Sequence, residues 1–505
     1  MRPGLVSLLI LVLALVPNVA LASDPPTWDE PIQIGDAIPS SWFPDINVDP
    51  NGKVRMVWSA SLVEGDLNES HAIAGAVIYA EETAEGWSNP ADIFVMDGGI
   101  ASRPMIVSDG AWVHLIFRYA PPGVPVRVVY SRAPAGADLH NTHSWSAPLK
   151  LTTDESYWTQ IRVLPDGRLV VLYNQMIPVK VGGIEERRPA LYSRTSDDHG
   201  LTWSSPRRIS TSADRVARTT LASTADGSHL LAAWDVGYDN MSATGTPSGV
   251  ATAVSADGGQ TWSEPWTLNG EYEQSVVATD NHRALLVYRS TISDRLFYRT
   301  STDGGLTWSA GREVPGAQAR EYVNKHNFDK LSLAVDGDGR FLLGWVGTDE
   351  DAPKGLSVMV ATWDGLVWTN PQVVASPDGF PEYPRLAISL GNQMRVAYFV
   401  RDNVFDIGRY TMWIVNGTSD AATIAPLDIE PAPLIVPATP IIPTPQLFTG
   451  VTPPPAPAPV ERPVLSNSTP QAINTLPIRQ IVTMTASGVV IAMLIAGVVY
   501  RLARG

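Results

Sequence analysis

The stretch SADGGQTWSEP, at residues 255–265, decides the fold because the chain contains it three times in nearly the same form. The other copies are SDDHGLTWSSP at residues 196–206 and STDGGLTWSAG at residues 301–311. All three share the pattern Ser-x-Asp-x-Gly-x-Thr-Trp. A motif that returns at a near-constant interval is typical of a repeat architecture, in which each repeat is one unit of supersecondary structure.

The tryptophan of this motif also marks degenerate copies along the chain. The segments TWDEP, GWSNP, SWSAP and VWTNP extend the series, which then has tryptophans at positions 28, 87, 145, 203, 262, 308 and 368. The interval is about 60 residues, shortened once to about 46, which suits four strands and their loops. Alternating apolar hairpins, such as QIRVLPDGRLVVLY, lie ahead of the tryptophans. Seven such hairpins begin near Phe43, Arg103, Trp158, Arg218, Glu273, Phe328 and Tyr383.

Both ends of this series are incomplete. The last hairpin is followed by a third strand and then by no tryptophan motif, whereas Trp28 has no hairpin before it. The two deficits cancel if TWDEPIQIG, at residues 27–35, supplies the outermost strand of the last unit. Such a closure leaves neither the first nor the last sheet with a free edge. We therefore predict an all-β fold, a seven-bladed β-propeller over residues 25–418 that is closed by an N-terminal strand.

The two ends of the chain carry targeting signals. Residues 1–22 combine an early Arg, a short apolar run and small residues, which is typical of a signal peptide. Residues 419–477 are predicted to form a Pro-rich linker, since 15 of the 42 prolines lie between positions 426 and 477. Residues 478–500 include an uncharged run long enough for one transmembrane helix, and a basic cytoplasmic tail follows at 501–505. We expect a single-pass protein of the cell membrane whose propeller lies outside the cytoplasm.

Composition narrows the classes of function. The chain has no Cys, so the exported part depends on its core rather than on disulfides. A net charge of −15 argues against general binding of nucleic acids, whose phosphates would be repelled. His140 and His143 lie in one loop with no third ligand nearby in the sequence, so we expect neither a metal nor another cofactor. The oligomeric state stays open.

The repeated motif resembles the Asp-box, or bacterial neuraminidase repeat (BNR), of sialidases and several other propeller families. In that family the box is the turn between the third and fourth strands. The resemblance implies that a short polar side chain binds the turn backbone, that Gly adopts conformations other residues avoid, and that Trp packs between blades. Asp198, Asp257 and Asp303 would then be folding residues, and the ligand site would lie at the opposite face of the blades.

Arginines gather at that opposite face. The positions where first strands begin and second strands end share this face, and six of them are Arg103, Arg118, Arg218, Arg289, Arg385 and Arg401. Guanidinium groups bind carboxylates and sulfates at two points, which favours an anionic carbohydrate as the partner. The alternative is that these arginines pair with neighbouring acids or only solvate the strand ends.

The resemblance to sialidases also implies a catalytic set. Sialidases combine an arginine triad for the sugar carboxylate with a Tyr nucleophile, a Glu that assists it and an Asp acid/base. The segment EQSVVATDNHRALLVYR resembles the family's Glu strand and nominates Glu273 and Arg289. EYPRL nominates Tyr383 as the nucleophile, and SRPMI nominates Arg103. Asp45 is the candidate acid, because the loop after HLIFRYAPPGVP lacks an Asp, and KGLSVMVATW lacks the third arginine of the triad.

Three classes of function remain. The first is an exo-acting, sialidase-like glycosidase that acts on anionic glycans. The second is a non-catalytic receptor that binds glycans or peptides. The third is a scaffold whose face docks another protein. An enzyme requires an acid, Glu273 and Tyr383 around one point, a receptor requires only the arginines, and a scaffold predicts a broad apolar patch.

Overall fold

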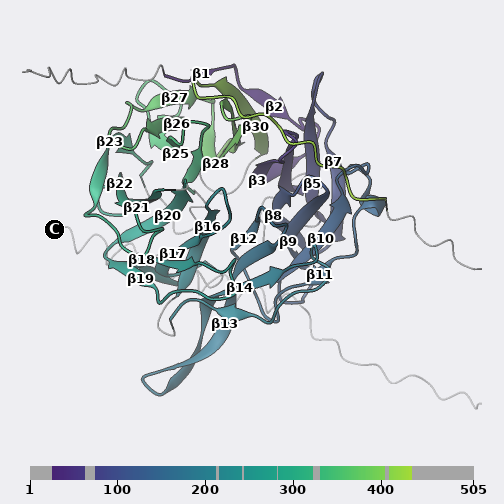
Figure 1. Ribbon diagram of the computed structural model, residues 1–505, viewed down its shortest axis with the longest axis horizontal. Helices are drawn as coiled ribbons and strands as arrows, with labels where there is room; N and C mark the ends of the chain where they lie inside the picture. The colour runs from purple at the N-terminus through teal and green to yellow at the C-terminus, as the bar shows by residue number, and fades with distance from the viewer. Residues whose placement is uncertain are drawn as a thin grey trace, which may run out of the picture. The chain divides into compact units, whose positions relative to one another are not determined.

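The computed structural model describes residues 25–62, 74–211, 215–240, 244–280, 282–321, 330–403 and 409–434. Within this part of the chain, seven antiparallel sheets surround a common axis as the blades of a ring (Figure 1). Consecutive innermost strands contact one another, and the last of them, β28 (Phe380–Ser389), contacts the first, β3 (Ser40–Val48). The predicted all-β, seven-bladed propeller is confirmed.

The strands of each blade follow one another from the axis outward. With β3 and β28, the innermost strands are β8 (Ile100–Ser108), β12 (Thr159–Val163), β16 (Val216–Ser223), β20 (Tyr272–Thr279) and β24 (Ser332–Val335). The second strands are β4 (Val54–Ser61), β9 (Trp112–Ala120), β13 (Leu169–Val181), β17 (Leu230–Asp239), β21 (Ala284–Ser290), β25 (Phe341–Thr348) and β29 (Gln393–Arg401). The third strands are β5 (Ala74–Thr83), β10 (Arg127–Pro134), β14 (Ile184–Ser196), β18 (Thr244–Ser255), β22 (Arg295–Ser301), β26 (Leu356–Trp363) and β30 (Tyr410–Thr418). The outer strands are β6 (Gly86–Trp87), β7 (Ala91–Asp97), β11 (Leu149–Lys150), β15 (Arg207–Arg208), β19 (Trp266–Asn269), β23 (Arg312–Gln318) and β27 (Gln372–Ala375).

We number the blades 1 to 7, from the blade of β3 to the blade of β28. One short 3-10 helix, η1 (Thr142–Ser144), lies between β10 and β11 of blade 2. The innermost strands begin, and the second strands end, at what we call the mouth face. The turns between first and second strands and the Asp-boxes lie at the opposite end, the turn face.

The N-terminal segment closes the ring as predicted. β1 (Thr27–Trp28) and β2 (Ile32–Ile34) both pair antiparallel with β30 of blade 7. Trp28 lies opposite Gly417, where a Cβ atom would come within 2.5 Å of the indole, so only glycine fits there without a shift. The first residues of the fold thereby cover the outer edge of the last blade.

The Asp-box of blade 5 has the geometry of the turn that the resemblance implies. The Oδ1 atom of Asp303 accepts hydrogen bonds from Ser301 Oγ at 2.7 Å and from the Thr307 amide at 2.9 Å. These hydrogen bonds lower the pKa of Asp303 to about 2, although partial burial acts in the other direction. Trp308 Nε1 donates to Thr252 Oγ1 of blade 4 at 3.1 Å. The box therefore fixes its own turn and ties its blade to the preceding one.

Apolar clusters fill the spaces between neighbouring blades. Between blades 4 and 5, for example, Leu231 and Ala233 pack with Leu286 and Tyr288. Each blade is stabilised by its two neighbours, so the ring gains stability from closure as well as from each sheet.

The residues that follow the last blade lie against the ring. Residues 419–434, which we call the strap, cross the turn face and form the yellow-green segment in Figure 1. Backbone amides of the strap donate to carbonyl groups of three turns: from Ile424 to Leu390, from Leu427 to Pro50 and from Ala432 to Ala111. The sequence predicts that these residues belong to the Pro-rich linker, but three of their amides are held by blades 7, 1 and 2.

The remaining targeting segments lie outside the described residues. These are the predicted signal peptide at 1–22, the linker beyond position 434, the predicted transmembrane span at 478–500 and the tail at 501–505. Among the residues that the structure describes, no helix has the length and apolar character needed to cross a membrane.

Candidate functional site

Five innermost strands shift register against the second strand near the mouth face, as at a β-bulge. In four of these bulges one residue other than Gly has a positive φ: Phe43 (53°), Arg103 (49°), Gln274 (54°) and Tyr383 (57°). Such a conformation costs on the order of 1–3 kcal/mol, and residues that adopt it cluster at functional sites. Two of the four, Arg103 and Tyr383, are residues that the sequence nominates.

Aromatic rings from two blades enclose the guanidinium of Arg103. Its Cζ atom lies 3.7 Å from the ring centroid of Phe43, 4.3 Å from that of Tyr157 and 4.6 Å from that of Trp158. Its Nη2 donates to Tyr157 Oη at 2.9 Å, and its backbone amide donates to Ser59 Oγ at 2.7 Å. Cation–π contacts and these hydrogen bonds fix the planar group in one orientation.

A second guanidinium shares the Tyr157 ring. The Cζ atom of Arg118 lies 4.5 Å from the centroid of that ring, and its Nε donates to the Ser156 carbonyl at 3.2 Å. Arg103 and Arg118 are each 5% exposed, so water screens their mutual repulsion poorly.

Two further basic side chains approach the indole of Trp158, which also contacts Arg103. Arg218 Cζ and Lys330 Nζ lie 5.9 Å and 5.8 Å from the centroid of its indole. Lys330 also donates to the Thr219 carbonyl at 2.9 Å. Burial, together with the nearby positive charge of Arg385, holds the pKa of Lys330 well below its usual value.

Glu273 is the acid at the centre of an ion-pair network in blades 4 and 5. Its Oε2 lies 3.3 Å from Arg218 Nη1, and its Oε1 lies 3.1 Å from Arg289 Nη1. Arg289 also pairs with Asp294, and Arg218 with Asp235 at 3.4 Å. Both carboxylate oxygens of Glu273 are engaged by arginines, and its side chain is buried.

Asp235 fastens blade 4 to blade 5. Its carboxylate accepts hydrogen bonds from the backbone amides of Gln274 and Ser275, each at 2.8 Å, and from Ser275 Oγ at 2.7 Å. These amides belong to the bulge of β20, where the strand ladder is interrupted. Burial raises the pKa of Asp235 above its usual value, although Arg218 and Ser275 act in the opposite direction.

Asp45 plays a similar part between blades 1, 2 and 7. Its Oδ2 accepts a hydrogen bond from the Ile106 amide at 2.9 Å, and its Oδ1 accepts one from Arg385 Nε at 3.1 Å. Both side chains line a cavity of about 270 Å³ along the axis, to which the innermost strands of all seven blades contribute. Arg103, Arg118 and Glu273 are not among the residues that line this cavity. The role of Asp45 as an acid stays a prediction.

Tyr383 and Arg401 belong to blade 7. The Tyr383 ring packs edge-on against Phe43, with centroids 5.4 Å apart. Arg401 pairs with Glu382, the residue before Tyr383, and Arg320 approaches the same Glu382 oxygen at 2.8 Å. Glu382 is fully buried.

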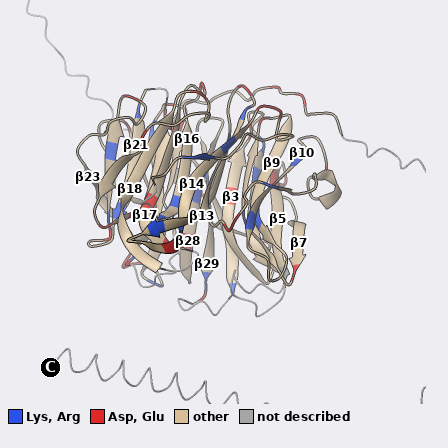
Figure 2. Ribbon diagram, turned by 90° about the horizontal axis from the view of Figure 1, so that it is seen from below, with Lys and Arg blue, Asp and Glu red and all other residues tan. Residues whose placement is uncertain are grey.

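The structure connects most of the nominated residues through one path of contacts. The path runs from Tyr383 through Phe43, Arg103, Trp158, Arg218 and Glu273 to Arg289. Arg118 joins it at Tyr157, whereas Asp45 and Arg385 form a separate pair in the axial cavity. Basic and acidic segments are interspersed along the strands rather than gathered on separate faces (Figure 2).

Several residues of this cluster were missed as candidate site residues. Tyr157 lies in the loop two residues before β12, and the strand pattern in the sequence carries no signal for such a residue. Glu382 and Arg320 become neighbours only through the contact between blades 6 and 7. Within the described residues, the expected pairing of arginines with acids is seen for Arg218, Arg289, Arg385 and Arg401.

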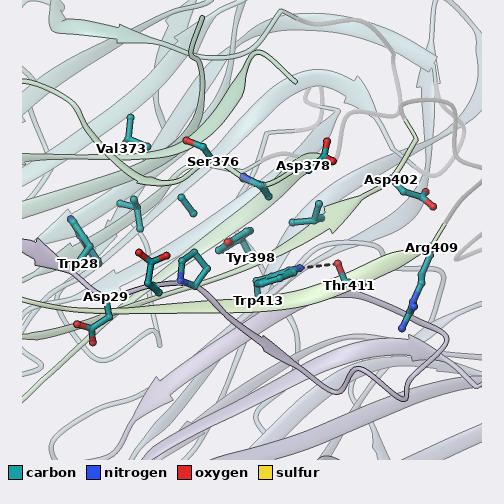
Figure 3. A pocket seen from close by; sticks show the side chains of 16 residues that line it. Trp28, Asp29, Val373, Ser376, Asp378, Tyr398, Asp402, Arg409, Thr411 and Trp413 are labelled. Atoms are coloured by element: carbon teal, nitrogen blue, oxygen red, sulfur yellow. Dashed lines mark hydrogen bonds between the residues drawn. The ribbon is translucent and has the colours of Figure 1, made fainter. Parts of the chain in front are cut away.

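A second cavity, of about 650 Å³, lies near the closing strand, between the outer parts of blades 6 and 7 (Figure 3). Trp28, Tyr398 and Trp413 contribute its aromatic surface, and Trp413 Nε1 donates to Thr411 at 2.8 Å. Its lining also contains four acids and one arginine: Asp29, Glu30, Asp378, Asp402 and Arg409. This excess of negative charge disfavours an anionic ligand, so the mouth face is the better candidate.

Comparisons with known proteins place the fold. Among solved structures, an ulvan lyase, a polysaccharide lyase bound to -[GlcA(1-4)Rha3S]-, is similar with a TM-score of 0.53, 12% identity and coverage of 78% of this chain and 97% of that chain. A protein of unknown function from Dyadobacter fermentans has a TM-score of 0.46, 13% identity and coverage of 78% and 99%. The NanB sialidase from Streptococcus pneumoniae has a TM-score of 0.43, 13% identity and coverage of 78% and 70%.

At such identities these likenesses concern the fold alone. No curated protein matches the sequence. A family model described as a BNR repeat-like domain matches residues 126–396, which is more than half of the 505 residues. With its seven blades and its three Asp-boxes, the chain therefore belongs to the BNR repeat-like family and is a sialidase-like β-propeller.

Proposed function

We propose that the mouth face binds an anionic glycan, and that a sugar carboxylate lies between Arg103 and Arg118. The observation that carries this proposal is the pair of guanidinium groups stacked on one Tyr157 ring, at 4.3 and 4.5 Å. Both are oriented by protein contacts before a ligand arrives, which reduces the entropy that binding must overcome. The aromatic rings that hold them also offer apolar surface to a sugar.

The positive φ of Arg103 supports the same proposal. This conformation is strained, and stability alone would favour a residue that fits the blade without strain. The strain at Arg103 is therefore consistent with a role in binding. The ulvan lyase of similar fold is bound to a saccharide that contains GlcA. We therefore include glucuronate as well as sialic acid among the carboxylated sugars to be tested.

We expect the full chain to bind 3′-sialyllactose or a glucuronate disaccharide in preference to neutral lactose in isothermal titration calorimetry. Arg103→Ala should weaken that binding by about ten- to a hundredfold, since it removes a charge-assisted contact of about 1.5–3 kcal/mol. Arg103→Lys should also weaken it, because an ammonium lacks the planar fork. The matched control is Arg207→Ala, which removes an exposed arginine from β15 at the outer edge of blade 3.

Equal affinity for lactose and 3′-sialyllactose would contradict the proposal, as would an unchanged affinity in a folded Arg103→Ala variant. In either case the docking scaffold becomes the better hypothesis.

Turnover is the finer part of the proposal. Tyr383, the candidate nucleophile, contacts Phe43, which in turn contacts Arg103. Glu273 is connected to Arg103 by successive contacts through Arg218 and Trp158. Hydrolysis of a synthetic sialoside that Tyr383→Phe abolishes would establish an exo-sialidase. Binding without hydrolysis would establish a receptor with a sialidase-like fold.

We also propose that the propeller is extracytoplasmic and held by residues 478–500, for which the sequence features at both ends are the support. Protease added to intact cells should release a soluble fragment that contains the propeller, by cleavage in the Pro-rich segment beyond residue 434. A cytoplasmic protein of the same cells serves as the control for lysis. If the propeller is protected until the cells are broken, the proposed orientation is reversed.

A further inference from the structure

Three metal-ligating side chains meet on the turn face between blades 2 and 3. Asp109 lies in the turn before β9, His114 lies in β9, and His199 belongs to the Asp-box of blade 3. One potential ligand atom from each lies within 4.8 Å of the other two. We propose that this cluster binds a divalent transition-metal cation such as Zn²⁺ and thereby clasps blade 2 to blade 3.

The hydrogen bonds around His114 determine which of its nitrogens is free to bind a cation. Tyr130 Oη donates its only proton to the His199 carbonyl at 2.9 Å. The contact of 2.8 Å between His114 Nδ1 and Tyr130 Oη must then be donated by the histidine. This assignment leaves Nε2 of the neutral ring without a proton, so that its lone pair is available to a cation. Its other nitrogen is held as metal-binding histidines commonly are, through a hydrogen bond outside the coordination sphere.

The lone pair on His114 Nε2 faces an acid. His114 is fully buried, and its Nε2 has no hydrogen-bond partner but lies 3.5 Å from Asp109 Oδ2. A lone pair and a carboxylate at this distance repel each other, and a cation between them turns that repulsion into attraction.

Asp109 is oriented for the same role. Its Oδ1 accepts hydrogen bonds from the amides of Ala111 at 2.9 Å and Trp112 at 2.6 Å. The other oxygen, Oδ2, faces both histidines and accepts a hydrogen bond from His199 Nδ1 at 2.9 Å, whose proton a bound cation would displace. Two backbone amides therefore already hold the Asp109 carboxylate in place as a ligand.

His199 occupies a position where the other two boxes have glycine. The pattern Ser-x-Asp-x-Gly places His199 in register with Gly258 and Gly304, which have φ values of 70° and 73°. His199 adopts a φ of 53°, a conformation that costs a residue with a Cβ on the order of 1–3 kcal/mol. The one box that accepts this strain is the box whose imidazole meets Asp109 and His114.

Two imidazole nitrogens and one carboxylate oxygen suit Zn²⁺ with water as the fourth ligand. Ligands at tetrahedral angles and bond lengths of 2.0–2.1 Å are about 3.3 Å apart. Asp109 Oδ2 lies 2.9 Å from His199 Nδ1 and 3.5 Å from His114 Nε2, so the two separations bracket that value. The ring of His199 is half-exposed and can move to bring the two imidazole nitrogens to the required separation. Arg132, which donates to the His199 carbonyl at 2.7 Å, brings a positive charge that lowers the affinity.

The test uses the full chain, stripped with a chelator and titrated with ZnCl₂ by calorimetry, and with Co²⁺ by visible absorption. We expect one ion per chain, tetrahedral Co²⁺ bands and a higher melting temperature with Zn²⁺ that the chelator reverses. His199→Gly restores the residue found in the other boxes and should fold without strain. It should weaken Zn²⁺ binding by more than the ten- to hundredfold that loss of an outer-shell partner costs, and abolish the shift in melting temperature.

The matched control is His143→Ala, which removes an exposed histidine from η1 and should leave both readouts unchanged. Zn²⁺ binding that survives in His199→Gly with equal affinity would place the ion elsewhere and overturn the proposal. A wild-type chain without a Zn²⁺-dependent shift in melting temperature would overturn it as well.

Discussion

Deleting residues 25–35 is expected to convert the closed ring into an open, aggregating one. These residues contain β1 and β2, which cover the outer edge of β30, and Ile34, which is buried in the core between blades 1 and 7. Without them, β30 presents a long unpaired edge that can pair with another chain. The loss of closure should remove a large part of the roughly 5–15 kcal/mol that stabilises a typical domain.

Size-exclusion chromatography and thermal unfolding measure this effect. A circular permutant provides the sharpest control, because Thr27 lies directly opposite Thr418. A chain that begins at residue 36, passes from Thr418 through an Asn-Gly turn and ends with residues 27–35 restores the same strand pairs. The permutant should be as monodisperse as the segment 25–418 in its native order, which also lacks the strap. A deletion variant that stays monomeric with an unchanged melting temperature would show that closure contributes little.

Replacing Asp235 by Ala is expected to reduce the free energy of unfolding by about 3–5 kcal/mol. The carboxylate is 2% exposed and holds two backbone amides of the β20 bulge that no strand partner can satisfy. Each buried amide left without an acceptor costs about 1–3 kcal/mol, and Arg218 loses its ion pair with Asp235. Asp235→Asn keeps an acceptor and should lose less.

Denaturant titration followed by intrinsic fluorescence measures the change. Glu264→Ala, at an exposed position of the same blade, is the matched control and should stay within about 0.5 kcal/mol of the wild type. If Asp235→Ala unfolds at the wild-type denaturant concentration, the acid is not the fastening between blades 4 and 5.

The ring and its closure were predictable because they depend on features that are periodic in the sequence. The tryptophans at near-constant intervals counted the blades, and the incomplete first and last units required Trp28 to pair with the last sheet, as it does opposite Gly417. Strand ends were predictable to within a few residues, which is why the arginines at the mouth face were found.

Side-chain partners at the mouth were not predictable, because they belong to different blades. Asp45 and Arg385 are 340 residues apart and meet only when the ring closes. The same Asp45 was nominated as an acid from its position alone, and the structure engages it with Arg385 and the Ile106 amide. The positive φ of Arg103 was not predictable, because a residue before Pro ordinarily adopts an extended conformation with a negative φ.

The candidate cation site was missed for a related reason. His140 and His143 are the histidines that lie close together in the sequence, and with no third ligand near them the sequence predicts no metal. His114 and His199 lie in different blades and share no local motif. The available signal was the histidine at position 199, where the other two boxes have Gly258 and Gly304.

The strap delays the transfer of tension from the C-terminal part of the chain to the ring. A pull on the chain beyond residue 434 loads the strap from its far end, where the Ala432 amide is bonded to Ala111, and then at Leu427 and Ile424 in turn. We expect these hydrogen bonds to break one after another, because they are loaded in sequence and do not share the force. β30 lies between β29 on one side and β1 and β2 on the other, and it bears tension only after the strap has come away. A pull on the C-terminal side would therefore first detach the strap, which lengthens the free chain, and only then strain the blades.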